Sequence, residues 1–536
     1  MKKLFIKLIL LLILPSLCGC SSNLHNEDDI IFKTESGYSI NLGMENVDTL
    51  NPLFTNSFSV KDCMQLIFEP LFSFDEALNP VCVLAESCMP SKDFLTYTIN
   101  LKTGIKWHDG SDFTSADVKQ SMNLIRYNQS PYSQNLKNIY SITTPDEKTV
   151  VIKLSKPDAN ITAVLSFPIV QKSIDAQLLP DYVPIGTGPY KYDKKISSNK
   201  IRLVPNKNWS GNIPSMNEIH LNIYKDIPSL ISAFNASEID AVSSVCMDLR
   251  TNTPRGEIKI SDYISNNLVF LGINNSYSEF KSANTRKALS LLIDKDDIVT
   301  TEVFSRAVCV NVPVNPSAWY APKSSTPTKD KTYIEELLSL DGWTLNENNQ
   351  YTRNVEITDD SGEVQKIDEI LSVNILINDN NNERVKVAEK IATEFNKFNI
   401  QTKVIKVGFE DYQNRISEKK YSLFIGEIQI PYNMDLSSLL STNNYFSYYS
   451  KNMNDALYNI SISTQTQSIK DAYSNLSVLF TDEMPFIPLY FRKEGVIFEK
   501  SVSGTNPPTM FTTFKNPENW YVSKIKTTEQ KEDIKE

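Results

Sequence analysis

Apolar and polar residues alternate near position 100 in the pattern of a strand with one buried face. Tyr97, Ile99 and Leu101 are separated by polar neighbours, and side chains two residues apart lie on the same side of a strand. Thr114 then occupies an expected helix N-cap, and Asp117 stands three residues later, where the acid of a capping box is found. The pattern therefore predicts a strand followed by a capped helix.

The residues between this strand and this helix predict two turns. Gly104 and Gly110 each follow a residue common in turns, and glycine adopts backbone angles that other residues resist. A short strand over 105–107 is expected between the turns. Phe113 and Val118 stand on either side of the predicted cap, at the positions of a hydrophobic staple. The whole run therefore specifies its own local structure.

A second unit with a clear pattern lies in the C-terminal half. Val373, Ile375 and Ile377 alternate as in a strand, and apolar residues between 385 and 395 recur at helical spacing. Residues 402–407 then have the pattern of another strand. A strand–helix–strand unit of this length predicts two parallel strands joined by a crossover helix.

Three shorter runs add to this outline. Residues 59–69 carry apolar side chains at helical spacing after a turn at Asn51-Pro52. Residues 268–274 form an apolar run typical of a buried strand, and residues 286–294 predict a helix that follows it.

Length and composition change the picture from elements to domains. The chain has 536 residues, 41% of them hydrophobic, which predicts a soluble protein of several domains. Lys and Arg number 54 and Asp and Glu number 64, giving a net charge of −10. A nucleic-acid-binding protein needs a basic face, so this acidic balance argues against a nucleic-acid partner. It is compatible with cationic or neutral ligands.

The N-terminus has the pattern of a targeting segment. Lysines are followed by an apolar run over 8–14 that is too short to span a bilayer. The sequence Leu17-Cys18-Gly19-Cys20 resembles a bacterial lipobox. That resemblance implies removal of residues 1–19, lipidation of Cys20 and a polar tether over 20–32. An ordinary secretory peptide cut near the same point is the alternative.

Cysteine and histidine usage predicts no metal site. Five cysteines follow the targeting segment, and they are Cys63, Cys82, Cys88, Cys246 and Cys309. This odd, dispersed set is no disulfide framework, although either a Cys82–Cys88 pair or free buried thiols would fit. The three histidines, His25, His108 and His220, lack metal-ligand spacing. His108 is interpreted as a surface turn residue.

No catalytic motif appears in the chain. It contains no GxSxG, HExxH, P-loop or CxxC sequence. Gly186-Thr187-Gly188 could suggest a phosphate loop, but it lacks the later glycine and the Lys-Ser/Thr pair. We therefore expect no enzymatic activity, no cofactor and no bound metal. A binding protein needs only a cleft, a hinge and a few oriented polar groups.

Several motifs resemble those of the family 5 extracellular solute-binding proteins, the oligopeptide, dipeptide and nickel receptors of bacterial ABC importers. Leu101–Gly110 and Phe113–Val118 match the signature Leu-Arg-x-Gly-x-x-Trp-x-Asp-Gly and Phe-(Thr/Ser)-Ala-x-Asp-Val. Gly186–Tyr190 matches the family's Gly-Thr-Gly-Pro-Tyr, and recognisable blocks follow in order from 40 to 521. The few histidines count against a His-dependent nickel receptor.

The resemblance implies an α/β fold of the two-lobed periplasmic-binding-protein type II class, with mixed sheets and an extra third domain. The implied divisions are a signal peptide over 1–19, a tether over 20–32, domain I over 33–74, 186–265 and 490–526, domain II over 75–185, domain III over 266–489 and a loose tail over 527–536.

It also implies a function and partners. The chain would be a substrate-binding lipoprotein that captures an oligopeptide or another small solute and delivers it to an ABC permease and its ATPase. We expect a monomer, held extracytoplasmically by its lipid anchor on the outer face of the cell membrane of a Gram-positive bacterium. A peptide-signal sensor without a transport role, or a receptor for a non-peptide solute, is the alternative.

Site residues follow from the family motifs where the sequence matches them. Many peptide receptors carry Gly-Trp-x-x-Asp-Tyr, whose Asp pairs with the α-amine of the peptide. Here Glu427 replaces the Trp, and Ile430 or Pro431 replaces the Asp, while Glu427 or Asp435 could supply the charge from a shifted position. Glu427 either faces the cleft or ends a solvated strand. The predicted ligand-binding residues are Asn56, Phe58, Tyr132, Glu427, Gln429, Tyr490 and Arg492.

The other members of this set have alternatives too. Asn56 and Phe58 belong to a ligand-facing or an ordinary surface loop. Tyr132 faces the peptide or is a satisfied tyrosine of domain II. Arg492 could bind a carboxylate bidentately or lie at the surface.

Overall fold

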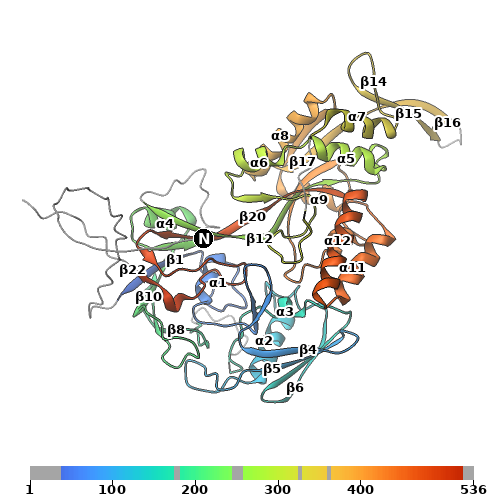
Figure 1. Ribbon diagram of the computed structural model, residues 1–536. Coiled ribbons are helices and arrows are strands. Elements are labelled where there is room, and N and C mark those ends of the chain that lie inside the picture. Colours follow the sequence, from blue (N-terminus) through green and yellow to red (C-terminus); the bar gives the residue numbers. More distant parts are fainter. Residues whose placement is uncertain (1–37, 174–181, 244–256, 324–328, 359–363, 523–536) are drawn as a thin grey trace, which may run out of the picture. The chain divides into compact units, whose positions relative to one another are not determined.

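A mixed sheet of eleven strands organises the protein (Figure 1). The computed structural model describes residues 38–173, 182–243, 257–323, 329–358 and 364–522. The predicted signal peptide, Cys20, the tether and the tail lie outside these ranges. The strands, in spatial order, are β18 (Gln401–Val407), β17 (Ser372–Asn378), β19 (Leu423–Gln429), β12 (Ile258–Ile273), β20 (Phe486–Glu499), β11 (Ala241–Ser243), β1 (Ser39–Glu45), β10 (Glu218–Tyr224), β9 (Lys200–Pro205) and β8 (Tyr190–Ser197), with β13 (Ala307–Cys309) beside β20.

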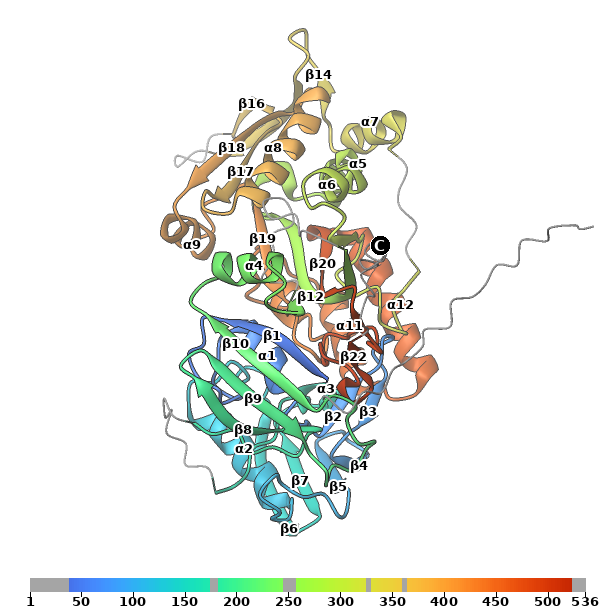
Figure 2. The ribbon, with the colours of Figure 1, turned by 90° about the vertical axis from the view of Figure 1, so that its left-hand side faces the viewer.

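Two long antiparallel strands, β12 and β20, serve two hydrophobic cores. The last residues of β12 and the first of β20 pack in a core that we call the second core, together with β17 and β19. Val496 and Phe498, near the other end of β20, pack in the first core with β1, β9 and β10. The pairing of the two strands shifts register between Ile264 and Leu268. Figure 2 labels both strands together with β19, and in the sheet order β19 adjoins β12 while β11 adjoins β20.

The predicted crossover unit is present in the second core. β17 and β18 pair in parallel from Ser372 with Gln401 to Asn378 with Val407. Helix α8 (Asn382–Lys397) joins them and buries its apolar face, because its apolar residues recur every three to four positions. This prediction is confirmed.

The predicted strand and capped helix lie beside a smaller sheet. β5 (Thr96–Leu101) alternates half-buried and buried residues, and α2 (Ser115–Tyr127) begins with a complete capping box. The backbone N–H of Thr114 donates to Asp117 Oδ2 at 2.8 Å. The expected strand over 105–107 is only an isolated bridge between Lys106 and Asp112. The sheet order is β4 (Ala85–Pro90), β5, β7 (Thr149–Leu154) and β6 (Ile139–Asp146).

His108 is not the surface residue that its turn suggested. Its imidazole is half-buried. Nδ1 accepts the backbone N–H of Gly186 at 3.2 Å, and Nε2 lies 3.1 Å from the carbonyl oxygen of Gly188. Burial lowers the pKa of His108 to about 4, so the ring is neutral at physiological pH and donates from Nε2. His108 therefore ties the first family motif to the second.

Two smaller predictions need correction or refinement. The helix expected over 59–69 is α1 (Phe58–Met64), and it gives way to tighter turns in which Leu66 and Ile67 donate to carbonyls three residues back. Cys82 and Cys88 are free thiols, so the pair is not formed. Cys82 is exposed rather than buried, and Cys246 lies outside the described residues.

The remaining elements surround the two cores, and the buried residues of α4 form a third, smaller cluster with Ile239, Val242 and Ile497. The helices are α3 (Ile161–Val164), α4 (Ile227–Asn235), α5 (Ala283–Leu292), α6 (Lys295–Thr301), α7 (Lys331–Leu340), α9 (Phe409–Ser417), α10 (Ser437–Leu440), α11 (Lys451–Ile462) and α12 (Thr466–Glu483), and the short strands are β2 (Phe72–Phe74), β3 (Pro80–Cys82), β14 (Thr344–Leu345), β15 (Tyr351–Thr358), β16 (Val364–Ile370), β21 (Val502–Ser503) and β22 (Tyr521–Val522). None of the described helices has the length and apolar character needed to cross a membrane.

Candidate ligand-binding site

Strand pairing gathers charged side chains where β12 and β20 meet β19. Val269 of β12 pairs with Glu427 on one side and with Tyr490 on the other, so these two residues stand in one row across three strands. Arg492 follows Tyr490 by two positions and therefore shares its face. Glu383 approaches from the first turn of α8. The predicted residues Glu427, Tyr490 and Arg492 are thus brought together.

These side chains form a closed charge network, which we define as Glu383, Arg384, Glu427, Tyr490 and Arg492. Arg492 donates two hydrogen bonds to Glu427, from Nε to Oε1 at 2.7 Å and from Nη2 to Oε2 at 3.1 Å. Its Nη2 also donates to Glu383 Oε1 at 2.7 Å, and Tyr490 donates to the same oxygen at 3.3 Å. Arg384 Nε lies 3.8 Å from Glu427 Oε2. The charges of the two carboxylates are balanced by those of the two guanidinium groups, so the charge of Glu427 is compensated within the network.

The other predicted ligand-binding residues lie apart from the charge network. Gln429 is exposed at the end of β19. Asn56 is exposed, and Phe58 is 51% exposed at the start of α1. Tyr132 is half-buried and packs against Phe167 at a ring distance of 6.2 Å. Their contact with a ligand stays a prediction.

Sequence reasoning missed a second group, the tyrosine–carboxylate cage. We define it as Asp62, Tyr132, Tyr263, Tyr432 and Glu494, of which only Tyr132 was predicted. Glu494 follows Arg492 by two residues on β20, so strand periodicity alone places both on one face. No sequence pattern relates Asp62 to these residues, because it lies on a short helix more than four hundred residues from β20.

Hydrogen bonds fix the two carboxylates of the cage. Asp62 Oδ1 accepts the hydroxyl of Thr513 at 2.7 Å. Glu494 accepts from the Tyr263 hydroxyl at 3.1 Å and from the Asn267 amide at 2.5 Å. Neither carboxylate forms a salt bridge with a lysine or arginine of the described ranges.

The surroundings of the cage favour neutral forms of its acids. Burial, with a smaller contribution from the charge of Glu494, raises the pKa of Asp62 to about 7. Burial also raises the pKa of Glu494. The pKa of Tyr432 rises to about 12, first through burial and then through the nearby charges of Glu494 and Asp62. The cage therefore holds negative charge only at a cost in free energy.

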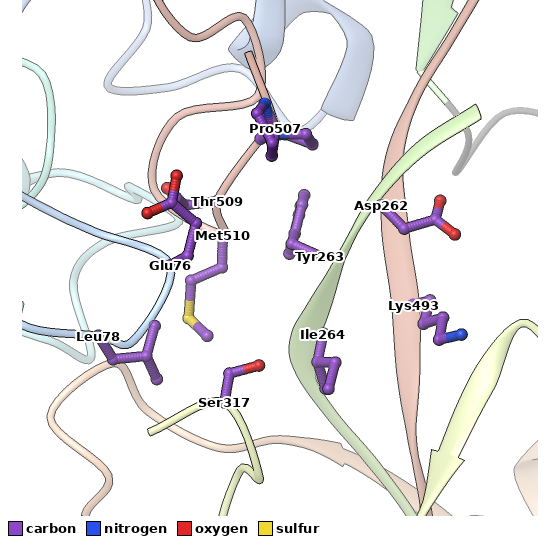
Figure 3. A pocket seen from close by; sticks show the side chains of 11 residues that line it. Glu76, Leu78, Asp262, Tyr263, Ile264, Ser317, Lys493, Pro507, Thr509 and Met510 are labelled. Carbon is purple, nitrogen blue, oxygen red and sulfur yellow. The ribbon is translucent and has the colours of Figure 1, made fainter. Parts of the chain in front are cut away.

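A small cavity lies beside the two long strands (Figure 3). Its volume is about 180 Å³, and Tyr263 and Ile264 of β12 form one wall. Met510 and Pro507, from the segment that returns to the first core, form another wall. Tyr263 therefore links this cavity to the carboxylate of Glu494.

A larger cavity of about 330 Å³ is lined by residues between 134 and 164, next to the smaller sheet, and by the segment after β19. Here Asn433 donates to Asp158 Oδ2 at 2.7 Å, and Lys156 lies 3.3 Å from Asp435. Burial raises the pKa of Asp158 to about 6. Tyr432 lines this cavity as well. The hydrogen bond between Asn433 and Asp158 thus joins the segment after β19 to the segment after β7, next to Tyr432.

No metal centre is present among the described residues, where no three His, Cys, Asp or Glu side chains gather. The arrangement offers buried carboxylates, phenols and amides around cavities, which suits noncovalent recognition of a polar solute.

Residues 79–452 match the family described as bacterial extracellular solute-binding proteins, family 5 Middle. The chain belongs to this family.

Curated relatives agree with this membership. A putative ABC transporter peptide-binding protein of Brucella ovis is 32% identical over 245 residues, which cover 43% of this chain and 46% of that protein. The chain thus spans about half the length of that relative. The oligopeptide-binding protein AppA of Bacillus subtilis is 22% identical over 553 residues, which cover 97% of this chain and 98% of AppA.

Solved structures show that the fold is shared. The unliganded open form of the murein tripeptide-binding protein MppA superposes with a TM-score of 0.74 at 17% identity, covering 91% of this chain and 98% of MppA. AppA of Bacillus subtilis, in complex with a nonapeptide, gives a TM-score of 0.62 at 19% identity, covering 91% and 99%. The predicted two-lobed type II fold is confirmed.

Proposed function

We propose that this protein is the substrate-binding component of a bacterial ABC importer and that it captures an oligopeptide. Two cores share the strands β12 and β20, and polar side chains from both gather beside that crossing. This arrangement is the single observation that carries the proposal, because paired lobes on a strand hinge can close around a solute. Similarity to AppA over nearly the whole chain supports a peptide as the ligand.

The N-terminal segment supports a proposal for where the protein is located. The lipobox-like Leu17–Cys20 supports lipidation of Cys20 and an anchor on the outer face of the membrane of a Gram-positive bacterium. The mature chain then acts as an extracytoplasmic monomer that delivers its ligand to a permease and ATPase. It acts as a binding protein rather than an enzyme, and the domain divisions given above remain part of this proposal.

A thermal-shift screen tests the peptide assignment. The purified chain without residues 1–20 is heated with pools of synthetic peptides, and separately with sugars, opines and metal chelates. We expect stabilisation by at least one peptide pool, because a ligand that binds only the folded state stabilises it by mass action. No stabilisation by any peptide, beside clear stabilisation by another solute class, would refute the oligopeptide assignment.

A peptide-signal sensor is the second candidate. It is favoured by the segment Gly426–Asp435, where the family's Trp and amine-binding Asp are absent. Growth of a deletion strain on peptides as the sole source of amino acids separates the two functions. Loss of growth supports transport, and unchanged uptake supports the sensor.

A further inference from the structure

The larger cavity, which Tyr432 and Asp158 line, has an apolar interior. Its apolar lining includes Val164 of α3, Met434 and Leu436 from the segment after β19, and Leu457 and Ile460 of α11. The first three of these side chains are buried, and the two from α11 pack against the second core. The volume of about 330 Å³ is roughly twice that of an apolar cavity that holds benzene. The cavity is therefore large enough for one bulky apolar group.

The carboxylates around this interior already have partners. Asp158 Oδ1 accepts the backbone N–H of Asn160 at 3.0 Å, and its Oδ2 accepts the amide of Asn433 at 2.7 Å. Asp435 Oδ1 accepts the first backbone N–H of α10 at 2.9 Å, and its Oδ2 lies 3.3 Å from the ammonium of Lys156. A cationic ligand group would therefore lose its hydration without gaining a free acid.

An anionic ligand group would gain little more. Lys156 is paired with Asp435, and Lys137 is the other cation of the lining. Lys137 is exposed, so water and salt screen its attraction for an acid. The lining therefore favours an uncharged apolar group over a charged group of either sign.

Neutral polar groups at the cavity suit a peptide as the source of that apolar group. The side chains of Gln134, Asn135 and Tyr432 form no hydrogen bond within the described ranges, and amides and phenols can bond the N–H and carbonyl groups of a peptide backbone. Gln134 and Tyr458 are exposed, so the cavity is open to solvent. Tyr432 comes shortly after Gln429, a predicted ligand-binding residue, so the cavity lies next to the end of β19.

We propose that the larger cavity receives one bulky apolar side chain of the captured peptide, aliphatic or aromatic, and that it sets the side-chain preference of this protein. Backbone contacts are the same for every peptide sequence, so a pocket for a side chain is what distinguishes one peptide from another. This inference rests on the proposed function and names the class of peptide that the site selects.

Position-scanned pentapeptide pools test the proposal on the purified chain without residues 1–20. In each pool one position carries Phe, Leu, Ala, Asp or Lys, and the other four are random. We expect Phe or Leu at one position to bind at least about tenfold more tightly than Ala by titration calorimetry, because burial of a large apolar side chain contributes that much. Asp and Lys at that position should bind no more tightly than Ala.

Two results of this scan would overturn the proposal. One is the absence of a preference for Phe or Leu at every position, although the pools bind. The other is equally tight binding of Asp or Lys at the position that prefers Phe or Leu, because the cavity offers neither charge a free partner.

Filling the cavity connects the preference to its residues. Leu457→Trp and Ile460→Trp each add bulk to its lining, so pools with Phe, Leu and Ala should then bind within about twofold of one another. Val478→Trp adds bulk at an exposed site of α12 and should retain the preference. Thermal melting without peptide establishes which variants are folded. An unchanged preference in a folded filling variant overturns the proposal.

Isolated apolar probes separate this proposal from the peptide assignment. The wild type is heated with indole, toluene and N-acetyl-leucinamide, and indole is added to the wild type before titration with the Phe pool. We expect stabilisation by at least one probe, and weaker binding of the Phe pool in the presence of indole. Stabilisation that is lost in a filling variant supports the cavity even where no pentapeptide binds and the peptide assignment fails. No stabilisation by any probe, together with no effect of indole on the Phe pool, overturns the cavity.

Discussion

Asp62 illustrates how burial of one side chain couples stability to pH. Its carboxyl accepts a hydrogen bond from Thr513, yet burial raises its pKa to about 7 from an ordinary 3.8. Between these two values the folded chain retains a proton that the unfolded chain has lost. The stability that this group contributes is therefore complete below about pH 4 and is lost as the pH rises to about 7.

Replacement of this acid should stabilise the ligand-free protein at alkaline pH. We expect Asp62→Asn to raise the free energy of unfolding by on the order of 2 kcal/mol at about pH 8, and to have little effect near about pH 4. Urea denaturation across this range measures the difference. The groups that also act on this carboxyl are Lys61, Glu494, Tyr132, Tyr263 and Tyr432.

Asp112→Asn is the matched control, because this exposed acid forms an ion pair with Lys106 at the surface. Its effect on unfolding should be small at each pH. A cage variant that is less stable than the wild type in alkaline solution would contradict the assigned role of burial.

At the scale of elements, the pairing of β12 with β20 depends on one glycine. Gly495 pairs with Asp262, and its φ of 158° is unusual for residues with a side chain. A Cβ atom there would lie 2.0 Å from the carbonyl oxygen of Ser261. The two strands can approach this closely only because Gly495 lacks a side chain.

Gly495→Ala should therefore force the two strands apart. We expect a loss of about 1–3 kcal/mol in the free energy of unfolding, as for overpacking in a core. Urea denaturation measures this loss, and Gly408→Ala is the control because a Cβ atom there meets nothing within 4 Å. Equal effects of the two substitutions would show that the close approach of the strands does not govern stability.

At the scale of the whole molecule, the two cores touch beyond the strands that they share. Asn433 donates to Asp158, and the backbone N–H of Ala159 donates to the carbonyl oxygen of Ser461 at 2.8 Å. Asp158 is buried, so loss of its donor leaves a buried carboxyl with weaker solvation. This contact can bias the balance between arrangements of the cores.

Asn433→Ala should shift that balance. We expect a larger radius of gyration by small-angle scattering without ligand, because the contact across the cores loses its donor to Asp158. Peptide affinity should change by a few-fold in the same preparation. Asn348→Ala, in an exposed turn, serves as the control, and an unchanged scattering profile for Asn433→Ala would argue that the contact has no role in this equilibrium.

The sequence alone predicted the parts whose structure depends on near neighbours. The capping box of Thr114 and Asp117 and the parallel strands β17 and β18 follow from spacings within a few residues or one crossover. The motifs Leu101–Gly110 and Phe113–Val118, which include this capping box, carried the resemblance to the family. His108 shows the limit even here, because its partners Gly186 and Gly188 lie about eighty residues away.

Only the tertiary structure decided the chemistry of the candidate site. The family motifs predicted Glu427 and Arg492 as site residues, but the pairing of β19, β12 and β20 made them partners and neutralised the charge of Glu427. Asp62, Tyr432 and Glu494 are hundreds of residues from one another or on different elements, and no periodicity relates them. Their arrangement arises from long-range packing that short sequence patterns do not encode.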